Sequence, residues 1–149
     1  MARKLVASLL TTACLLAGLT TPAEAVAPGI QAEVNAILAD GPGGRQISPD
    51  TVQYDGYTVT ARTVGAKLAA CRYGHLCVYT PSRTFDYYQC DIYPVTGYTG
   101  NGSYVNNQTS GTMTTFLRSN YSIYIASIAY SSGNANWDPV YYVNVCPRS

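Results

Sequence analysis

Short runs of strand-forming residues, divided by turn residues, fill the chain from about residue 68 to its end. The runs are rich in Tyr, Val, Ile and Thr, and Gly, Ser, Asn, Asp or Pro separate them at a spacing of roughly 8 to 15 residues, which is typical of an antiparallel sandwich or barrel. In the last run, Tyr141, Val143 and Val145 are expected to face the core. The expected strands are 76–80, 87–93, 103–107, 112–118, 122–130 and 140–146.

A helix and a hairpin are expected before this region. Ile30, Val34, Ile37 and Leu38 fall on one helical face, and the Gly-Pro-Gly-Gly at 41–44 ends the helix. Alternating apolar residues on both sides of an Asp-Gly turn then predict a hairpin.

We therefore expect a helix-plus-hairpin extension over residues 26–67 and a disulfide-bonded β domain over residues 68–149. The extension could pack on the β domain, be removed as a pro-segment, or form a separate module. The apolar face of its helix must be buried somewhere, which favours packing.

Residues 1–25 have the layout of a secretory signal peptide. Arg3 and Lys4 precede an apolar run that ends near Leu19, and Ala23-Glu24-Ala25 provides a small-x-small cleavage pattern. The run is shorter than the roughly 20 residues that a membrane-spanning helix needs. We expect cleavage after Ala25, with cleavage after Ala27 as the alternative, and a mature chain that is extracellular and free of the membrane.

Four cysteines follow this segment: Cys71, Cys77, Cys90 and Cys146. An even number in an exported chain predicts two disulfides, for which three pairings are possible. We favour Cys71 with Cys77, because this pair is local. Cys90 with Cys146 would then tie the end of the chain to the middle of the domain.

Charge is scarce. The 149 residues contain nine Lys or Arg and eight Asp or Glu, so that 11% are charged, less than half of the roughly 25% that is usual. A net charge of +1 gives no basic surface for nucleic acid, which excludes that class of partner. From Tyr87 onward the only charged residues are Asp91, Arg118, Asp138 and Arg148.

Two segments carry a family resemblance. C-R-Y-G-H-L-C-V-Y at Cys71–Tyr79 and S-Y-V-N-N-Q-T-S-G-T at Ser103–Thr112 resemble the secreted actinobacterial proteinase-inhibitor family whose best-known member is the streptomycete metalloproteinase inhibitor. The resemblance implies a mainly β fold, an antiparallel Greek-key sandwich like that of the βγ-crystallins. It also implies inhibition of an extracellular proteinase, in particular a metalloproteinase.

The sequence departs from that fold's motifs in two places. Asp86-Tyr87 follows Phe85 where the crystallin hairpin has a glycine. The superfamily's calcium motif is matched at 106–110 until Gly111 replaces the final Ser, and no carboxylate is near it in the sequence. Because calcium sites usually include carboxylates, we expect no metal site.

An inhibitor presents a loop whose conformation is fixed before binding, so that little ordering entropy is lost on association. Two loops are candidates, one from Thr80 to Phe85 and one between Cys71 and Cys77. The candidate inhibitory residues are Thr80, Arg83, Phe85, Tyr73 and His75.

The motifs of common enzymes are missing, so we expect neither catalysis nor a cofactor. His75 is the single histidine, and neither G-x-S-x-G nor H-E-x-x-H occurs. The β region offers Asp86, Asp91 and Asp138 as the carboxylates of a glycosidase pair, and we interpret Asp138 as a turn residue.

The alternative function is a non-enzymatic extracellular module that binds a glycan, the cell wall or a protein, or has a structural role there. Its signal is the density of tyrosine, a favoured contact residue, at Tyr121, Tyr124, Tyr130, Tyr141 and Tyr142.

Overall fold

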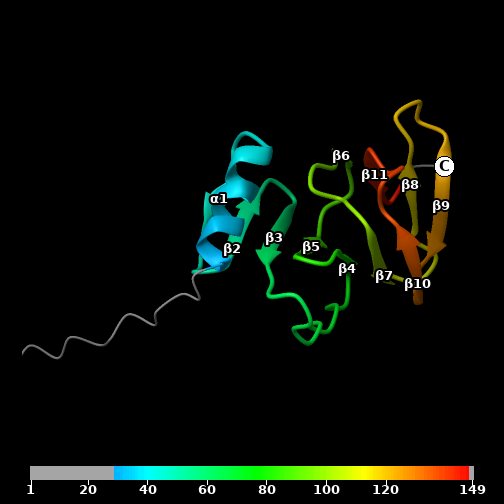
Figure 1. Cartoon of the computed structure of the whole chain (residues 1–149). Coiled ribbons are helices and arrows are strands. Elements are labelled where there is room, and N and C mark those ends of the chain that lie inside the picture. The colour runs from blue at the N-terminus through cyan, green and yellow to red at the C-terminus, as the bar shows by residue number, and fades with distance from the viewer. Residues whose placement is uncertain (1–28, 148–149) are drawn as a thin grey trace, which may run out of the picture.

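The computed structural model describes residues 29–147, which form a mainly β fold with one helix (Figure 1). The expected signal peptide, residues 1–25, lies outside the described residues. The elements are α1 (Ile30–Asp40), β1 (Arg45–Gln46), β2 (Thr51–Tyr54), β3 (Tyr57–Ala61), β4 (His75–Tyr79), β5 (Arg83–Tyr87), β6 (Ile92–Pro94), β7 (Asn101–Asn107), β8 (Met113–Leu117), β9 (Ile123–Ile128), β10 (Ser131–Asn136) and β11 (Tyr142–Val145).

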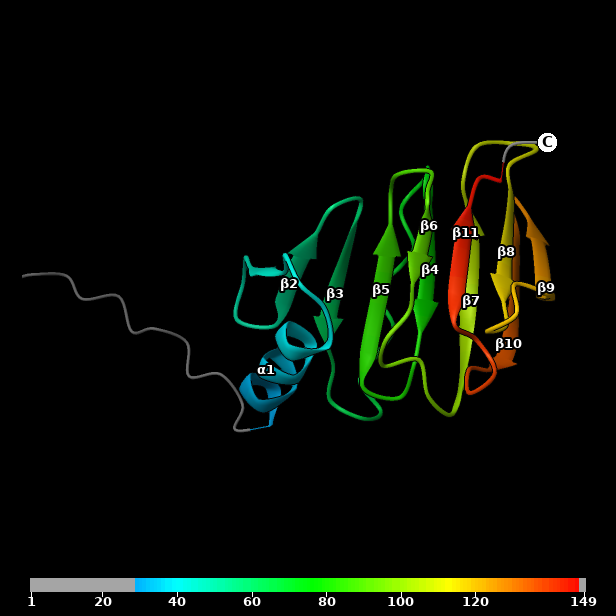
Figure 2. The same ribbon diagram turned by 90° about the horizontal axis from the view of Figure 1, so that it is seen from above.

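The strands form two antiparallel sheets. Sheet A has seven strands in the order β1-β2-β3-β5-β4-β7-β10, and sheet B has four in the order β6-β11-β8-β9. Seen from above, sheet A extends from the strands beside α1 to those beside sheet B (Figure 2). A mainly β, antiparallel fold is therefore confirmed.

Side chains alternate between the two faces of sheet A, as the two-residue period of a strand requires. On the inner face, paired positions on four neighbouring strands carry Val52, Val59, Phe85 and Val78, all of them buried. The outer face carries mostly Thr, Ser, Asn and Gln. Sheet A is thus one amphipathic layer with a single apolar face.

Two different elements cover this inner face. At one end α1 packs on β2 and β3 with Val34 and Ile37 fully buried, and the Tyr54 hydroxyl donates a hydrogen bond to the Ile37 carbonyl oxygen at 2.6 Å. At the other end the core includes Phe116 of sheet B and Val143 beside it. The apolar helix face predicted from the sequence is confirmed as a core-facing stripe.

The expected N-terminal extension is built into the same sheet. The hairpin of β2 and β3 is hydrogen-bonded to β5 in a register that runs from Tyr57 opposite Tyr87 to Ala61 opposite Arg83. In the structure the helix and hairpin therefore pack on the β region.

Aromatic side chains fill the space between the two covers. The rings of Tyr57, Tyr87 and Tyr93 lie 5.1–5.2 Å apart, centroid to centroid. The ring of Tyr98 lies 4.6 Å from that of Phe85, and its hydroxyl is 2.8 Å from the Tyr87 hydroxyl. This cluster joins the helix-covered end of the core to the end covered by sheet B.

Trp137 is fully buried beyond the cluster. Its indole Nε1 donates a hydrogen bond to the Tyr79 carbonyl oxygen at 3.0 Å, and its ring contacts Tyr98 and Phe116. Gly102 of β7 lies against this indole. No residue with a Cβ fits at position 102, because the Cβ would overlap both the Tyr79 carbonyl oxygen and the indole.

Most expected strands are confirmed, but some expectations were wrong. The strand expected at 87–93 does not form, because it overlaps only the last residue of β5 and the first two residues of β6, which lie in different sheets. The sequence predicted neither β5, most of which falls in the loop expected from Thr80 to Phe85, nor β10. Tyr141 precedes β11 and is exposed, whereas Val143 and Val145 are buried as expected.

The disulfides join Cys71 to Cys77 and Cys90 to Cys146, as favoured from the sequence. The first ties the segment before β4 to β4 itself. The second joins the loop after β5 to the end of β11. In the chain-entropy picture the long loop contributes about 4 kcal/mol and the short one about 2 kcal/mol to stability.

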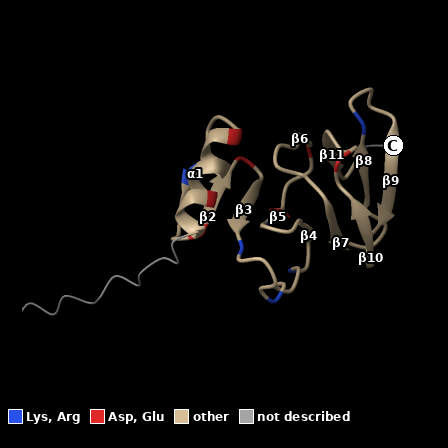
Figure 3. Cartoon of the chain, viewed as in Figure 1, with Lys and Arg blue, Asp and Glu red and all other residues tan. Residues whose placement is uncertain are grey.

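Charged residues concentrate on α1, on the strands next to it and in the loop between β3 and β4 (Figure 3). From residue 88 to residue 147 only Asp91, Arg118 and Asp138 are charged. No helix among residues 29–147 is long and apolar enough to cross a membrane.

We predict that the protein unfolds in alkali when its buried tyrosines ionise. Burial raises the pKa of Tyr57 and of Tyr93 to about 12, and it raises the pKa of Tyr87 and Tyr98 well above the usual value. The unfolded chain ionises these groups near pH 10, so their stabilisation is complete below about pH 10 and is lost as the pH rises to about 12.

A titration that follows phenolate absorbance together with far-ultraviolet circular dichroism checks this. Exposed tyrosines should ionise first and gradually. The buried tyrosines should ionise together in one step, and the circular dichroism of the β-sheets should be lost in the same step. Gradual ionisation of every tyrosine with the β signal intact would contradict the prediction.

Candidate functional site

The segment between Cys71 and Cys77 forms a tight turn on the outer face of sheet A. The His75 amide donates to the Arg72 carbonyl oxygen at 3.2 Å and closes a four-residue turn, in which Gly74 has a φ of 84° that side chains disfavour. The Gly74 amide also donates to the Asn107 carbonyl oxygen at 2.8 Å. With the disulfide across its ends, the turn is fixed before any partner binds.

Tyr73 occupies the tip of this turn and is 65% exposed. Tyr130 is also exposed and lies close enough to Tyr73 that desolvation and the interaction of the two phenols raise the pKa of Tyr130. Tyr130 has a left-handed φ of 68°, held by a hydrogen bond from its amide to the Asn106 carbonyl oxygen. This conformation belongs to the turn between β9 (Ile123–Ile128) and β10 (Ser131–Asn136).

An ionic network supports the turn from below. His75 Nδ1 lies 2.5 Å from Asp86 Oδ1, and Arg72 Nη2 lies 3.0 Å from Asp86 Oδ2. The side chains of His75 and Asp86 are less than one-fifth exposed. Among residues 29–147, Asp86 is the only side chain that hydrogen-bonds to the His75 imidazole, and no hydroxyl or thiol is aligned with it. The role of the His75–Asp86 pair that the structure supports is to position the turn.

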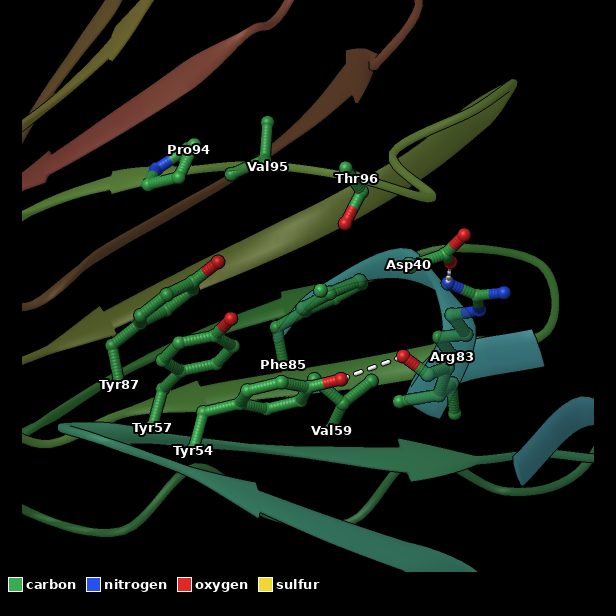
Figure 4. Close-up of a pocket in the computed structure, with 12 residues that line it drawn as sticks. Asp40, Tyr54, Tyr57, Val59, Arg83, Phe85, Tyr87, Pro94, Val95 and Thr96 are labelled. Atoms are coloured by element: carbon green, nitrogen blue, oxygen red, sulfur yellow. Dashed lines mark hydrogen bonds and ion pairs between the residues drawn. The ribbon is translucent and has the colours of Figure 1, made fainter. Parts of the chain in front are cut away.

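The second expected loop, Thr80 to Phe85, does not present its candidate residues. Arg83 is buried, with Nε 2.5 Å from Glu33 Oε1 and Nη1 paired with Asp40 (Figure 4). Thr80 and Phe85 are 3% exposed. The sequence interpretation was wrong for these three side chains, because β5 turns Arg83 inward, where it ties α1 to sheet A.

A small cavity lies beside Arg83, between α1, β2, β3, β5 and residues 94–96 (Figure 4). Its volume is about 20 Å³, room for about one water molecule. The rings of Tyr54, Tyr57 and Tyr87 line it. The cavity therefore belongs to the packing of the tyrosine cluster and is too small for an organic ligand.

The amides of the calcium-like segment have structural roles. Asn106 Nδ2 donates to the Ser127 carbonyl oxygen at 3.0 Å, and Asn106 Oδ1 accepts from the Gln108 amide. Gln108 Oε1 accepts from the Thr114 hydroxyl at 2.7 Å. Asn106 Nδ2 and Gln108 Oε1 thus tie the end of β7 to sheet B, and Asn106 Oδ1 holds the chain that follows β7.

The tyrosines of the alternative hypothesis are divided between different places. Tyr121 and Tyr142 stack at 4.5 Å, and Tyr124 lies under Arg118, whose guanidinium is 4.9 Å from the ring. Tyr130 is instead the neighbour of Tyr73. The structure therefore does not gather the five tyrosines at one site.

Sequence reasoning missed two parts of the turn site, Asp86 and Tyr130. Asp86 pairs with Cys77 across β4 and β5, which places it on the same face as His75. Tyr130 follows β9 and reaches the turn only because the chain there passes from sheet B to sheet A. Both contacts depend on strand register, for which the sequence carried no signal.

Comparison of the chain with protein-family models, with curated proteins and with solved structures found no match.

We predict that Arg83→Met lowers the free energy of unfolding by about 2 kcal/mol, because it leaves Glu33 and Asp40 close together without their cation. The value is below that for fully buried pairs, since both carboxylates keep some contact with water. Arg45→Met removes an exposed arginine from β1 and should change stability little. Urea denaturation with the disulfides intact measures both variants, and equal midpoints would refute the structural role of Arg83.

Proposed function

We propose that the protein is a secreted proteinase inhibitor that blocks an extracellular metalloproteinase with the Cys71–Cys77 turn. The observation that carries the proposal is the exposed Tyr73 at the tip of a turn fixed by a disulfide. The resemblance of the segment Cys71–Tyr79 to the inhibitor family supports a metalloproteinase as the target. Secretion, and a βγ-crystallin-like Greek key in the arrangement of the two sheets, are part of the same proposal.

The turn suits an inhibitor because its conformation is determined in advance. The disulfide, the hydrogen bond between Gly74 and Asn107, and the network around Asp86 all restrain it. Binding then costs little conformational entropy. A large aromatic side chain at the centre of such a contact is a typical hot spot.

The form of the turn also determines how it would inhibit. A substrate-like inhibitor presents an extended segment that lies along the proteinase cleft. Here the chain reverses within four residues, so the Tyr73 side chain would block the cleft. The backbone of the turn would not lie extended along the cleft as a substrate does. We therefore expect inhibition without cleavage of the 72–75 segment.

Titration of the secreted protein into a thermolysin-like metalloproteinase tests the proposal. The wild-type protein should abolish peptide hydrolysis near equimolar ratio. Tyr73→Ala should raise the inhibition constant at least about tenfold, the equivalent of roughly 1.4 kcal/mol. Tyr121→Ala removes an equally exposed tyrosine from the other sheet and should inhibit like the wild type.

Circular dichroism of each variant shows whether its fold is intact. The proposal fails if a large molar excess of folded wild-type protein leaves hydrolysis unchanged. It also fails if Tyr73→Ala and Tyr121→Ala inhibit equally well.

A further inference from the structure

A regular row of uncharged polar side chains lies on the outer face of β7 and β10. Inner positions of β7 face Trp137 and the core, so the alternate positions point outward. The register pairs Asn101 with Asn136 and Ser103 with Asn134 across the two strands. We call the five outward side chains the polar row; they are Asn101, Ser103, Ser132, Asn134 and Asn136.

The polar row has unused hydrogen-bonding groups. Asn136 Oδ1 accepts from the Asp138 amide. The other four side chains make no hydrogen bond to another described residue; Asn101, Ser132 and Asn134 are exposed and Ser103 is half-buried. The amide and hydroxyl groups of the row therefore point to the same side of the sheet. Neighbouring side chains of the row are about 5 Å apart across the two strands and about 7 Å apart along each strand.

The row is the floor of a groove. Residues 68–71 cross the outer face of sheet A and form one wall, where the Tyr79 hydroxyl donates to the Ala69 carbonyl oxygen at 2.8 Å. The hollow between this wall and the floor has a volume of about 520 Å³. A second, shallower hollow lies over Asn101 and Asn136 and shares Ser103 and Asn134 with the first, so that the two together extend along most of β10.

No charged side chain lines either hollow among the described residues. An ionic ligand would leave its charge uncompensated there, and burial of an unpaired charge is costly. The apolar side chains at the hollow belong to its wall, which carries the exposed Leu68, and to Val105 on β7. The polar floor therefore offers a peptide no deep apolar pocket for an anchor side chain. The groove thus suits a long, uncharged molecule that is rich in hydroxyl groups.

An aromatic surface adjoins one end of the row. Tyr130 is anchored through its amide to Asn106, at the end of β7 where Ser132 lies opposite Val105. Its ring is exposed and offers a face on which the C–H groups of a sugar ring can pack. Tyrosine provides such a contact at low entropic cost.

We propose that the outer face of β7 and β10 binds a linear neutral polysaccharide, with the polar row hydrogen-bonding to its hydroxyl groups. The ligand runs along β10 between the 68–71 wall and the free edge of the sheet. This site adjoins the Cys71–Cys77 turn, with which it shares Tyr130, and would hold the protein on an extracellular polymer.

Co-sedimentation with insoluble cellulose, chitin and starch tests the proposal with the secreted full chain. We expect the wild-type protein to sediment with at least one of these polymers, and an increase in salt of about tenfold to leave the bound fraction unchanged, because the ligand is neutral. Asn134→Asp keeps the side-chain shape and adds a charge to the row, and it should weaken binding at least tenfold. Asn35→Asp adds the same charge to an exposed position of α1 and should bind like the wild type.

Each opposite result overturns the proposal. It is wrong if the folded wild-type protein stays in solution with all three polymers, if salt releases it, or if Asn134→Asp binds as tightly as Asn35→Asp. Proteinase inhibition is measured separately on the same samples, so that loss of polymer binding in Asn134→Asp with inhibition intact distinguishes this site from the turn.

Discussion

The inner face of sheet A is a single apolar surface that is too wide for either of its covers. The helix α1 covers β2 and β3, and sheet B covers the strands at the other end. The gap between them falls over β5, and Tyr57, Tyr87, Tyr93 and Tyr98 fill it. Their rings bury a large apolar area while their hydroxyl groups find partners, as between Tyr87 and Tyr98.

Several other features depend on that arrangement. Arg83 lies at the edge of the gap and connects β5 to two carboxylates of α1. The inner face takes up nearly all of the apolar side chains of sheet A, which leaves its outer face polar. Both proposed sites, the Cys71–Cys77 turn and the polar row, lie on this outer face. Substitutions in either site would therefore change the packing of the core little.

Short stretches of sequence were enough to predict those features whose pattern is complete within a few residues. The apolar stripe of α1, the hairpin around Asp55-Gly56 and the Cys71–Cys77 disulfide are of this kind, and once Cys71 and Cys77 are paired, Cys90 and Cys146 are the cysteines that remain. Arg83 could not be placed, because its partners Glu33 and Asp40 lie 50 and 43 positions away. β10 was missed because Ser131–Asn136 has no large apolar side chain.

The reason for that composition is visible only in three dimensions. The inner positions of β10 lie over Tyr104 and the region of Trp137, which already fill the core, so that small residues suffice there. At Gly133 a Cβ would meet the Tyr104 ring. The hydrophobic alternation that marks other strands is therefore absent from a strand that is fully paired to β7.

This division also determines how the strand can evolve. Positions 131, 133 and 135 face inward and are restricted to small side chains, whereas positions 132, 134 and 136 face solvent. Substitutions at positions 132 and 134 change the chemistry of the surface without changing the packing beneath it, whereas Asn136 also holds the Asp138 amide. The surface chemistry of this strand can thus diverge among descendants of the chain at positions that the core does not restrict.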